Sequence, residues 1–254
     1  MINQDQLLLW TFIFMRCTGF ILMNPILGRR TIPPIVKSGF IMALSMLIYV
    51  YSPMQAIQIS GFIEYVMLLI KELIVGYLLG YVMQLFAYIC IYAGGIIDFQ
   101  LGLSMAMIYD PQNNSQVSLT GNVFNTLMIL IFFAVDGHLA LIKIFMELAN
   151  IIPYSAANIT PNSMSFLLSL FTECTVLAVK LAFPILIIIF LTEMGVGVLM
   201  KAIPQINVFV VNIQAKIIIG MIVLIFMFSP IGDFLNSTIV MMINSIRELG
   251  LLIK

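Results

Sequence analysis

Long runs of apolar residues, separated by short polar breaks, make up most of this chain. A helix needs roughly 20 apolar residues to cross a hydrocarbon layer about 30 Å thick. No stretch alternates apolar and polar residues in the way a barrel strand does. The pattern therefore predicts an all-α membrane protein with five to six long, partly broken apolar helices. Helical runs are expected at residues 7–27, 35–51, 62–97, 123–135, 139–148, 166–200 and 208–228, with an amphipathic tail at residues 234–253.

The composition agrees with this pattern. Apolar residues make up 62% of the chain and charged residues 9%, and the mean hydropathy is +1.15. A soluble domain contains about 45–50% apolar and about 25% charged residues, so this chain has too few polar groups to cover its surface in water. The net charge of zero argues against a nucleic-acid partner, which requires a basic face. No positive charge precedes the first apolar run, which is therefore interpreted as a retained helix and not as a cleavable signal.

Several charged residues interrupt the apolar runs. Each costs roughly 2.5–3.5 kcal/mol at the centre of a membrane helix unless it is paired or hydrated. They are explained if they lie at helix ends, if their helices pack around a polar interior with other subunits, or if the protein is an ion transporter. The interrupting residues are Arg16, Lys71, Glu72, Glu173, Lys180, Glu193 and Lys216. Polar contacts between helices are expected at Arg16, Glu72, Asp98, Gln100, Lys180 and Glu193.

Proline and glycine mark further irregular positions. Pro184 lies inside a long apolar run, where it removes a hydrogen-bond donor and kinks the helix. Irregular backbone at membrane depth persists only where it is buried in protein or lines a cavity. Three glycines surround Asp98 and Gln100, which predicts a bent and closely packed polar element. The spacing Gly76-x-x-x-Gly80 would let two helices approach closely.

The chain offers few residues for catalysis. His138 is the only histidine, and Asp136-Gly137-His138 is typical of a turn. The three cysteines show no paired spacing and are interpreted as small buried apolar residues. There is no phosphate-binding loop or nucleophile elbow. Asp98 and Asp110 could form the carboxylate pair of an intramembrane protease, but neither lies in the middle of an uninterrupted helix. We therefore predict no catalytic residue, no metal site and no cofactor.

A set of short motifs follows one another through nearly the whole chain: Phe14-x-Arg16-x-x-Gly19, Pro25, Pro33, Glu72-x-x-x-Gly76-x-x-x-Gly80, Gly95-x-x-Asp98-x-Gln100-x-Gly102-x-Ser104, Asp110-Pro111, Gly137-His138, Phe183-Pro184, Glu193-x-Gly195 and Pro204-Gln205-x-Asn207-Val208-Phe209. In this order the motifs resemble the FliR family of flagellar type III export-gate subunits and their SctT-like relatives in injectisomes. The chain departs from the family pattern at Asn212-Ile213-Gln214, where the family usually has Gly-x-Pro, so the bend of that segment stays open.

The resemblance implies a subunit of a protein-conducting channel that is not an enzyme. The expected partners are FliP-like and FliQ-like subunits, FlhB-like and FlhA-like export proteins, and unfolded flagellar substrate proteins. The implied fold is a single membrane-embedded domain, FliP-like over residues 1–165 and a FliQ-like helical hairpin over residues 166–254. The implied location is the bacterial inner membrane, in the flagellar basal body. Gly137-His138 favours the flagellar branch over the injectisome branch.

By position, the resemblance also implies a channel plug after Gly102-x-Ser104. Flexible apolar side chains there would close a pore against ions and part for an unfolded polypeptide. The alternative is that these residues continue a buried helix. The plug residues are Met105, Ala106, Met107, Ile108 and Tyr109. Structural turns are expected at Pro111, Gly137, His138, Pro184 and Pro204.

Two other classes of function stay open. A stand-alone secondary transporter would bind an ion at Asp98 or Glu193, and it predicts two halves with matching broken helices. The sequence contains no such internal repeat. A purely structural membrane scaffold predicts that substitutions in the plug change neither ion conductance nor protein export.

Overall fold

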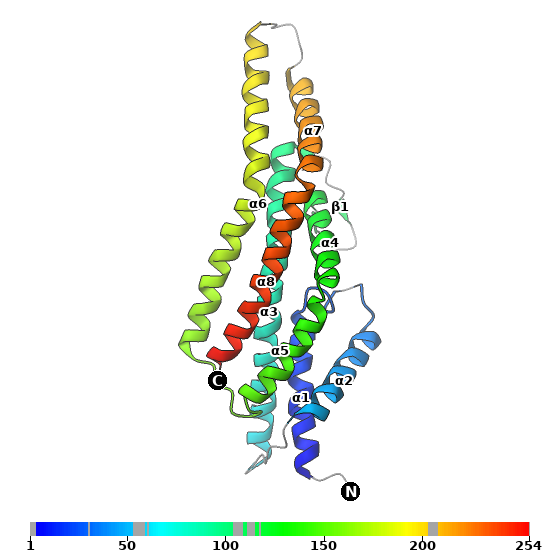
Figure 1. The fold of residues 1–254 in the computed structure, drawn as a ribbon, viewed down its shortest axis with the longest axis vertical. Helices are drawn as coiled ribbons and strands as arrows, with labels where there is room; N and C mark the ends of the chain where they lie inside the picture. Colours follow the sequence, from blue (N-terminus) through cyan, green and yellow to red (C-terminus); the bar gives the residue numbers. More distant parts are fainter. Residues whose placement is uncertain are drawn as a thin grey trace. The chain divides into compact units, whose positions relative to one another are not determined.

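The computed structural model describes residues 4–29, 31–52, 59, 61–103, 109–110, 115–116, 118–202 and 208–253. In this part the chain forms eight α-helices and one pair of very short strands (Figure 1). The expected all-α membrane fold is confirmed. The helices are α1 (Gln4–Met23), α2 (Pro34–Tyr51), α3 (Phe62–Leu101), α4 (Leu119–Ala134), α5 (Gly137–Ile151), α6 (Pro161–Ala202), α7 (Val208–Phe226) and α8 (Phe228–Leu252).

The two strands lie in the break that was expected between residues 102 and 121. They are β1 (Tyr109–Asp110) and β2 (Ser115–Gln116), each two residues long. They pair antiparallel, with Tyr109 opposite Gln116 and Asp110 opposite Ser115. The backbone therefore turns back on itself between α3 and α4.

Two of the helices are much longer than a bilayer is thick. The helix α3 contains 40 residues and α6 contains 42, which at 1.5 Å per residue gives about 60 Å for each. The hydrocarbon layer is only about 30 Å thick. Among the described residues four helices, α1, α2, α3 and α6, are long and apolar enough to cross it, or up to six spans if each broken pair, α4 with α5 and α7 with α8, forms one.

Local chemistry explains where several helices begin and end. The helix α2 begins at Pro34, because proline fits the first turn, where a backbone donor is not needed. Gly102 ends α3 with a φ of 78°, the left-handed conformation in which glycine commonly closes a helix. The Thr160 side chain accepts a hydrogen bond from the backbone N–H of Ser163 at 3.4 Å. This cap and Pro161 make α6 begin five residues earlier than the apolar pattern indicated.

The chain divides into two compact units, each built from several segments. Unit 1 contains Met1–Phe86, Phe133–Phe171 and Ile239–Lys254, and unit 2 contains Ala87–Phe132 and Thr172–Thr238. The family resemblance implies a different division, with a single boundary at residue 165 of the sequence. That division stays a prediction.

Each unit has its own apolar core. In unit 1, Phe20 of α1 and Phe145 of α5 meet edge to face with ring centroids 4.4 Å apart, and both are buried. In unit 2, Cys90 of α3 lies 3.5 Å from the sulfur of Met128 of α4. Many apolar side chains on α2, α6 and α7 stay exposed. Such large exposed apolar faces are suited to lipid or to other subunits.

Candidate functional site

The carboxylate of Asp98 joins the end of α3 to the beginning of α4, both within unit 2. Asp98 is 1% exposed. Its oxygens accept hydrogen bonds from the Ser118 hydroxyl at 2.6 Å, from the Thr120 hydroxyl, and from the Thr120 backbone N–H at 3.2 Å. The first N–H groups of a helix lack partners inside the helix and carry partial positive charge. A buried carboxylate at this position is therefore stabilised by the α4 terminus, which it caps in turn.

Ser118 and two glycines complete this contact. The Ser118 side chain accepts a hydrogen bond from the Gly121 N–H at 2.9 Å, which is the usual N-cap interaction. A Cβ atom added to Gly94 would lie 2.0 Å from the Gly121 nitrogen, so the two backbones touch. We call these five residues, Gly94, Asp98, Ser118, Thr120 and Gly121, the α3–α4 junction. It holds together the end of α3 and the beginning of α4, between which residues 103–117 lie in the sequence.

The expected plug residues lie in this stretch of the sequence. Met105, Ala106, Met107 and Ile108 lie outside the described residues, and so does the predicted turn at Pro111. Tyr109 is described by its backbone, in β1. The plug assignment stays a prediction. What the structure adds is that the helices before and after this stretch, α3 and α4, contact each other.

A second buried polar cluster lies in unit 1, around Arg16 of α1 and Glu72 of α3. The Arg16 Nε donates to Glu72 Oε2 at 2.6 Å, and the side chains are 3% and 0% exposed. The other Glu72 oxygen accepts from the Ser155 backbone N–H at 2.8 Å. Two residues expected to make polar contacts between helices are therefore brought together, although they are 56 positions apart.

The connector between α5 and α6 supplies the remaining partners of this cluster. Arg16 Nη1 donates to the Ile152 carbonyl at 3.4 Å, and the guanidinium lies 4.2 Å from the centre of the Tyr154 ring. Arg16 Nη2 is buried without a hydrogen-bond partner among the described residues. Burial raises the pKa of Tyr154 to about 12, with Arg16 opposing the shift. We call Arg16, Glu72, Tyr154 and Ser155 the arginine cluster.

Close helix packing explains why these two side chains meet. A Cβ atom on Gly76 would lie 1.9 Å from the Arg16 carbonyl oxygen, and one on Gly19 would lie 2.1 Å from the Leu73 carbonyl oxygen. Small residues let helix backbones approach in this way. Glu72 lies one turn before Gly76, on the same face of α3. The Glu72-x-x-x-Gly76 spacing thus places the carboxylate at the crossing point with α1.

The helices α6 and α7 are joined by an ion pair in unit 2. Lys216 Nζ of α7 contacts Glu193 Oε1 of α6, and the side chains are 14% and 33% exposed. Glu193 was expected to make a polar contact. The sequence identifies Lys216 only as a charge within an apolar run, because no pattern links it to Glu193 across 22 intervening residues.

The other two expected polar contacts are not formed within the described part of the chain. Gln100 is half-buried in the last turn of α3 and makes no hydrogen bond there. Lys180 is exposed on α6 and has no carboxylate within salt-bridge distance among the described residues. Neither side chain therefore has a hydrogen-bond or ion-pair partner among the described residues.

The predicted turns fall at different kinds of position. Gly137 opens α5 directly after Asp136, whose φ of 55° breaks the helix between α4 and α5, which are bent by 69°. The His138 ring lies 5.4 Å from the Phe133 ring, and its Nδ1 is buried without a partner among the described residues. Pro184 lies inside α6, which continues through it. Pro204 lies outside the described residues.

The buried polar groups of the described residues hold segments of the chain together. Within the described residues no group of three or more His, Cys, Asp or Glu side chains is arranged to hold a metal ion. Cys17, Cys90 and Cys174 are free thiols and are buried. The buried carboxylates of Asp98 and Glu72 are satisfied by donors from neighbouring segments. The polar groups therefore lock helices and connectors to one another.

Comparison with known proteins gives a consistent result along the chain. The model of the family described as bacterial export proteins, family 1, matches residues 7–242. The flagellar biosynthetic protein FliR of Bacillus subtilis (strain 168) is 28% identical over 93% of this chain and 92% of its own length. FliR of Escherichia coli (strain K12) is 26% identical over 99% of both chains. The Yop proteins translocation protein T of Yersinia pestis is 29% identical over 87% of this chain and 86% of its own.

Proposed function

Because the chain belongs to the bacterial export proteins, family 1, we propose that it is the FliR-like subunit of a flagellar type III export gate. With FliP-like and FliQ-like subunits it forms the channel through which unfolded flagellar proteins cross the inner membrane. The observation that carries this proposal is the continuity of the family match, which runs from residue 7 to residue 242 and includes parts of all eight described helices.

The geometry of the chain supports a channel subunit. The helices α3 and α6 are about twice as long as the hydrocarbon layer is thick, which suits a particle that extends beyond the bilayer. The exposed apolar faces on α2, α6 and α7 suit contacts with lipid and with neighbouring subunits. We further propose that FlhB-like and FlhA-like export proteins complete the assembly in the flagellar basal body, and that this chain catalyses no reaction.

The α3–α4 junction supports the assignment of the plug to residues 105–109. A loop that closes a pore needs fixed ends, so that its central residues open and return to one position. Asp98, Ser118 and Thr120 provide that anchor. Met105 and Met107 between the anchored ends have flexible apolar side chains and Ile108 adds another apolar one, as a seal against ions requires.

The plug is tested by ion conductance in cells that express the complete gate. Met105→Gly combined with Ile108→Gly is expected to increase the leak of ions across the membrane. Met46→Gly combined with Ile35→Gly makes the same two residue changes at exposed positions of α2 and is the matched control. Equal conductance in both double variants would refute the plug assignment.

The gate function is tested by complementation. In a flagellated bacterium that lacks its own FliR, the chain is expected to restore motility and the release of hook and filament proteins into the medium. Restored flagellar assembly by a variant lacking residues 208–253, or no export by the intact chain together with its own FliP-like and FliQ-like partners, would contradict the proposal.

An injectisome gate is the second candidate. It is favoured by the Yersinia pestis translocation protein, whose 29% identity matches that of the flagellar relatives. Complementation of a strain that lacks this injectisome subunit separates the two roles. Secretion through the injectisome but not through the flagellar apparatus would assign the chain to virulence.

A further inference from the structure

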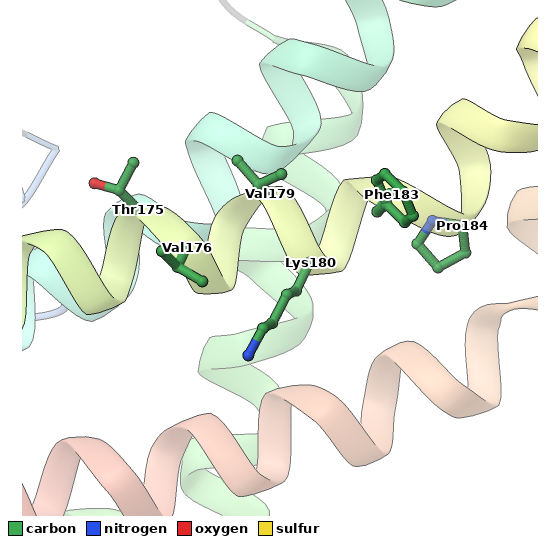
Figure 2. A pocket seen from close by; sticks show the side chains of 6 residues that line it. All are labelled: Thr175, Val176, Val179, Lys180, Phe183 and Pro184. Carbon is green, nitrogen blue, oxygen red and sulfur yellow. The ribbon is translucent and has the colours of Figure 1, made fainter.

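A shallow recess follows one face of α6 inside unit 2. Its volume is about 360 Å³. The residues that line it recur at helical spacing over about 14 Å of the helix axis, and five of the six are exposed. They are Thr175, Val176, Val179, Lys180, Phe183 and Pro184, whose side chains Figure 2 shows along the helix, with the Lys180 amine extending away from it.

Within the described part of the chain, Lys180 is a charge without a counter-ion in apolar surroundings. No carboxylate of the described residues lies within salt-bridge distance of its amine. The eleven residues that follow it, residues 181–191, contain no polar side chain. An unpaired lysine at the centre of a membrane helix costs roughly 2.5–3.5 kcal/mol, and such residues almost always pair or face a bundle interior.

Pro184 removes one backbone donor at the same place. A helix residue normally donates its N–H to the carbonyl four positions earlier, and proline has no N–H. The carbonyl of Lys180 therefore loses its usual donor. The recess thus presents a cation that needs an acceptor, on the residue whose carbonyl lacks its usual i+4 donor.

We propose that this recess is the docking site for a membrane helix of a neighbouring subunit, which carries an aspartate or glutamate against Lys180 and a hydroxyl or amide donor about one turn away. This inference rests on the proposed function and adds to it the chemistry of one subunit contact. The chain uses the same chemistry between α6 and α7, where Glu193 pairs with Lys216. A helix suits the recess because Val176, Val179 and Phe183 place a row of exposed apolar side chains along it, against which a second helix can pack.

A lipid headgroup fits these observations less well. Its phosphate would neutralise the amine but would leave the Lys180 carbonyl without a donor. The apolar stretch at residues 181–191 extends about 16 Å along the helix, so on that side the amine is far from a membrane surface. A protein helix supplies both an acceptor and a donor at any depth.

The test uses co-expression of the chain with its FliP-like and FliQ-like partners, followed by native mass spectrometry of the detergent extract. Lys180→Glu is expected to lose copies of the partner that occupies the recess, and Lys180→Arg is expected to keep them. Lys143→Glu, at an exposed position of α5, is the control with the same charge change. The unfolding of each purified variant in detergent separates a lost contact from a failure to fold.

Zero-length carbodiimide cross-linking then identifies the partner residue, because it joins an amine only to a carboxylate in direct contact. A Lys180 cross-link to a partner aspartate or glutamate, and restored assembly when that residue is changed to lysine in the Lys180→Glu background, would establish the site. An unchanged particle in Lys180→Glu, or loss of a bound lipid alone, would overturn the docking site and leave the gate function standing. Absence of any complex with the unaltered chain would overturn both.

Discussion

Loss of the charge on Glu72 should destabilise the protein far more than loss of an exposed charge. Glu72 and Arg16 are 0% and 3% exposed, and Glu72 also accepts the Ser155 N–H at 2.8 Å. Glu72→Gln keeps the shape of the side chain and leaves the Arg16 guanidinium buried without a counter-ion. Removing one partner of a buried ion pair costs about 3–5 kcal/mol, and we expect a loss in this range.

The chain contains its own control for this prediction. Arg247 and Glu147 form an ion pair at 2.8 Å in the same unit, with side chains 49% and 34% exposed. Exposed pairs contribute about 0–1 kcal/mol, because water and salt screen them. Glu147→Gln makes the same chemical change as Glu72→Gln, and it is expected to lower the free energy of unfolding by less than about 1 kcal/mol.

The assay is unfolding of the purified protein in mixed detergent micelles with increasing sodium dodecyl sulfate. The single tryptophan, Trp10, lies on α1 with its ring 5.5 Å from that of Phe14, six residues before Arg16. Its fluorescence therefore reports the release of α1. A thermal scan of the monodisperse fraction gives an independent ranking that does not require reversible unfolding.

A double variant separates the cost of an unpaired charge from the value of the pair. Arg16→Met with Glu72→Leu removes both charges, and we expect it to unfold less easily than Glu72→Gln alone, because no isolated charge stays buried. Equal stability of Glu72→Gln and Glu147→Gln would refute the reasoning. The reasoning would also be refuted if the double variant lost at least as much free energy of unfolding as the single variants Arg16→Met and Glu72→Leu lose together.

Three further predictions follow from the junction and the arginine cluster. Gly94→Ala should destabilise unit 2 by about 1–3 kcal/mol or more, because its Cβ would meet the Gly121 backbone. The adjacent Gly95→Ala has open space around its Cβ, and it should be neutral or stabilising in the same detergent titration. Asp98→Asn should lower the free energy of unfolding by about 1.5–3 kcal/mol, because a charged acceptor for three donors is lost. It should also speed hydrogen exchange at the Thr120 amide. The control Asp233→Asn, at an exposed position, should change neither quantity. Tyr154 has a folded pKa of about 12, above its usual value near 10, so its contribution to stability is fully present below pH 10 and is lost between about pH 10 and 12. The tyrosinate absorbance difference between the unaltered chain and Tyr154→Phe should titrate only in that upper range, and a titration below pH 10 would contradict the burial.

The helices were predictable from the sequence because the hydrophobic effect acts on whole runs of residues. The expected run at residues 62–97 became α3, Phe62–Leu101, and the run at 208–228 became α7, Val208–Phe226. The start of α6 was less predictable, because Thr160 and Pro161 specify it through capping and not through hydrophobicity. A hydropathy pattern does not reveal a helix boundary that is set by a capping side chain.

For the two buried polar clusters, the sequence predicted the charged residues but not their partners. Burial in an apolar run marks Arg16, Glu72 and Asp98 as residues that need partners, but it does not identify those partners. Ser118 and Thr120 were missed, although a serine directly before an apolar run is a preferred helix N-cap. Tyr154 and Ser155 were missed because they lie in a polar connector, and no local pattern shows that this connector folds back onto α1 and α3.

The central claim, that this chain is one subunit of an export gate, is tested most directly by its composition in the assembled state. The tagged chain is co-expressed with its FliP-like and FliQ-like partners, extracted in mild detergent and measured by native mass spectrometry. The expected result is a discrete particle that contains one copy of this chain and several copies of each partner. A stable monomer or homo-oligomer that ignores both partners would contradict the export-gate function.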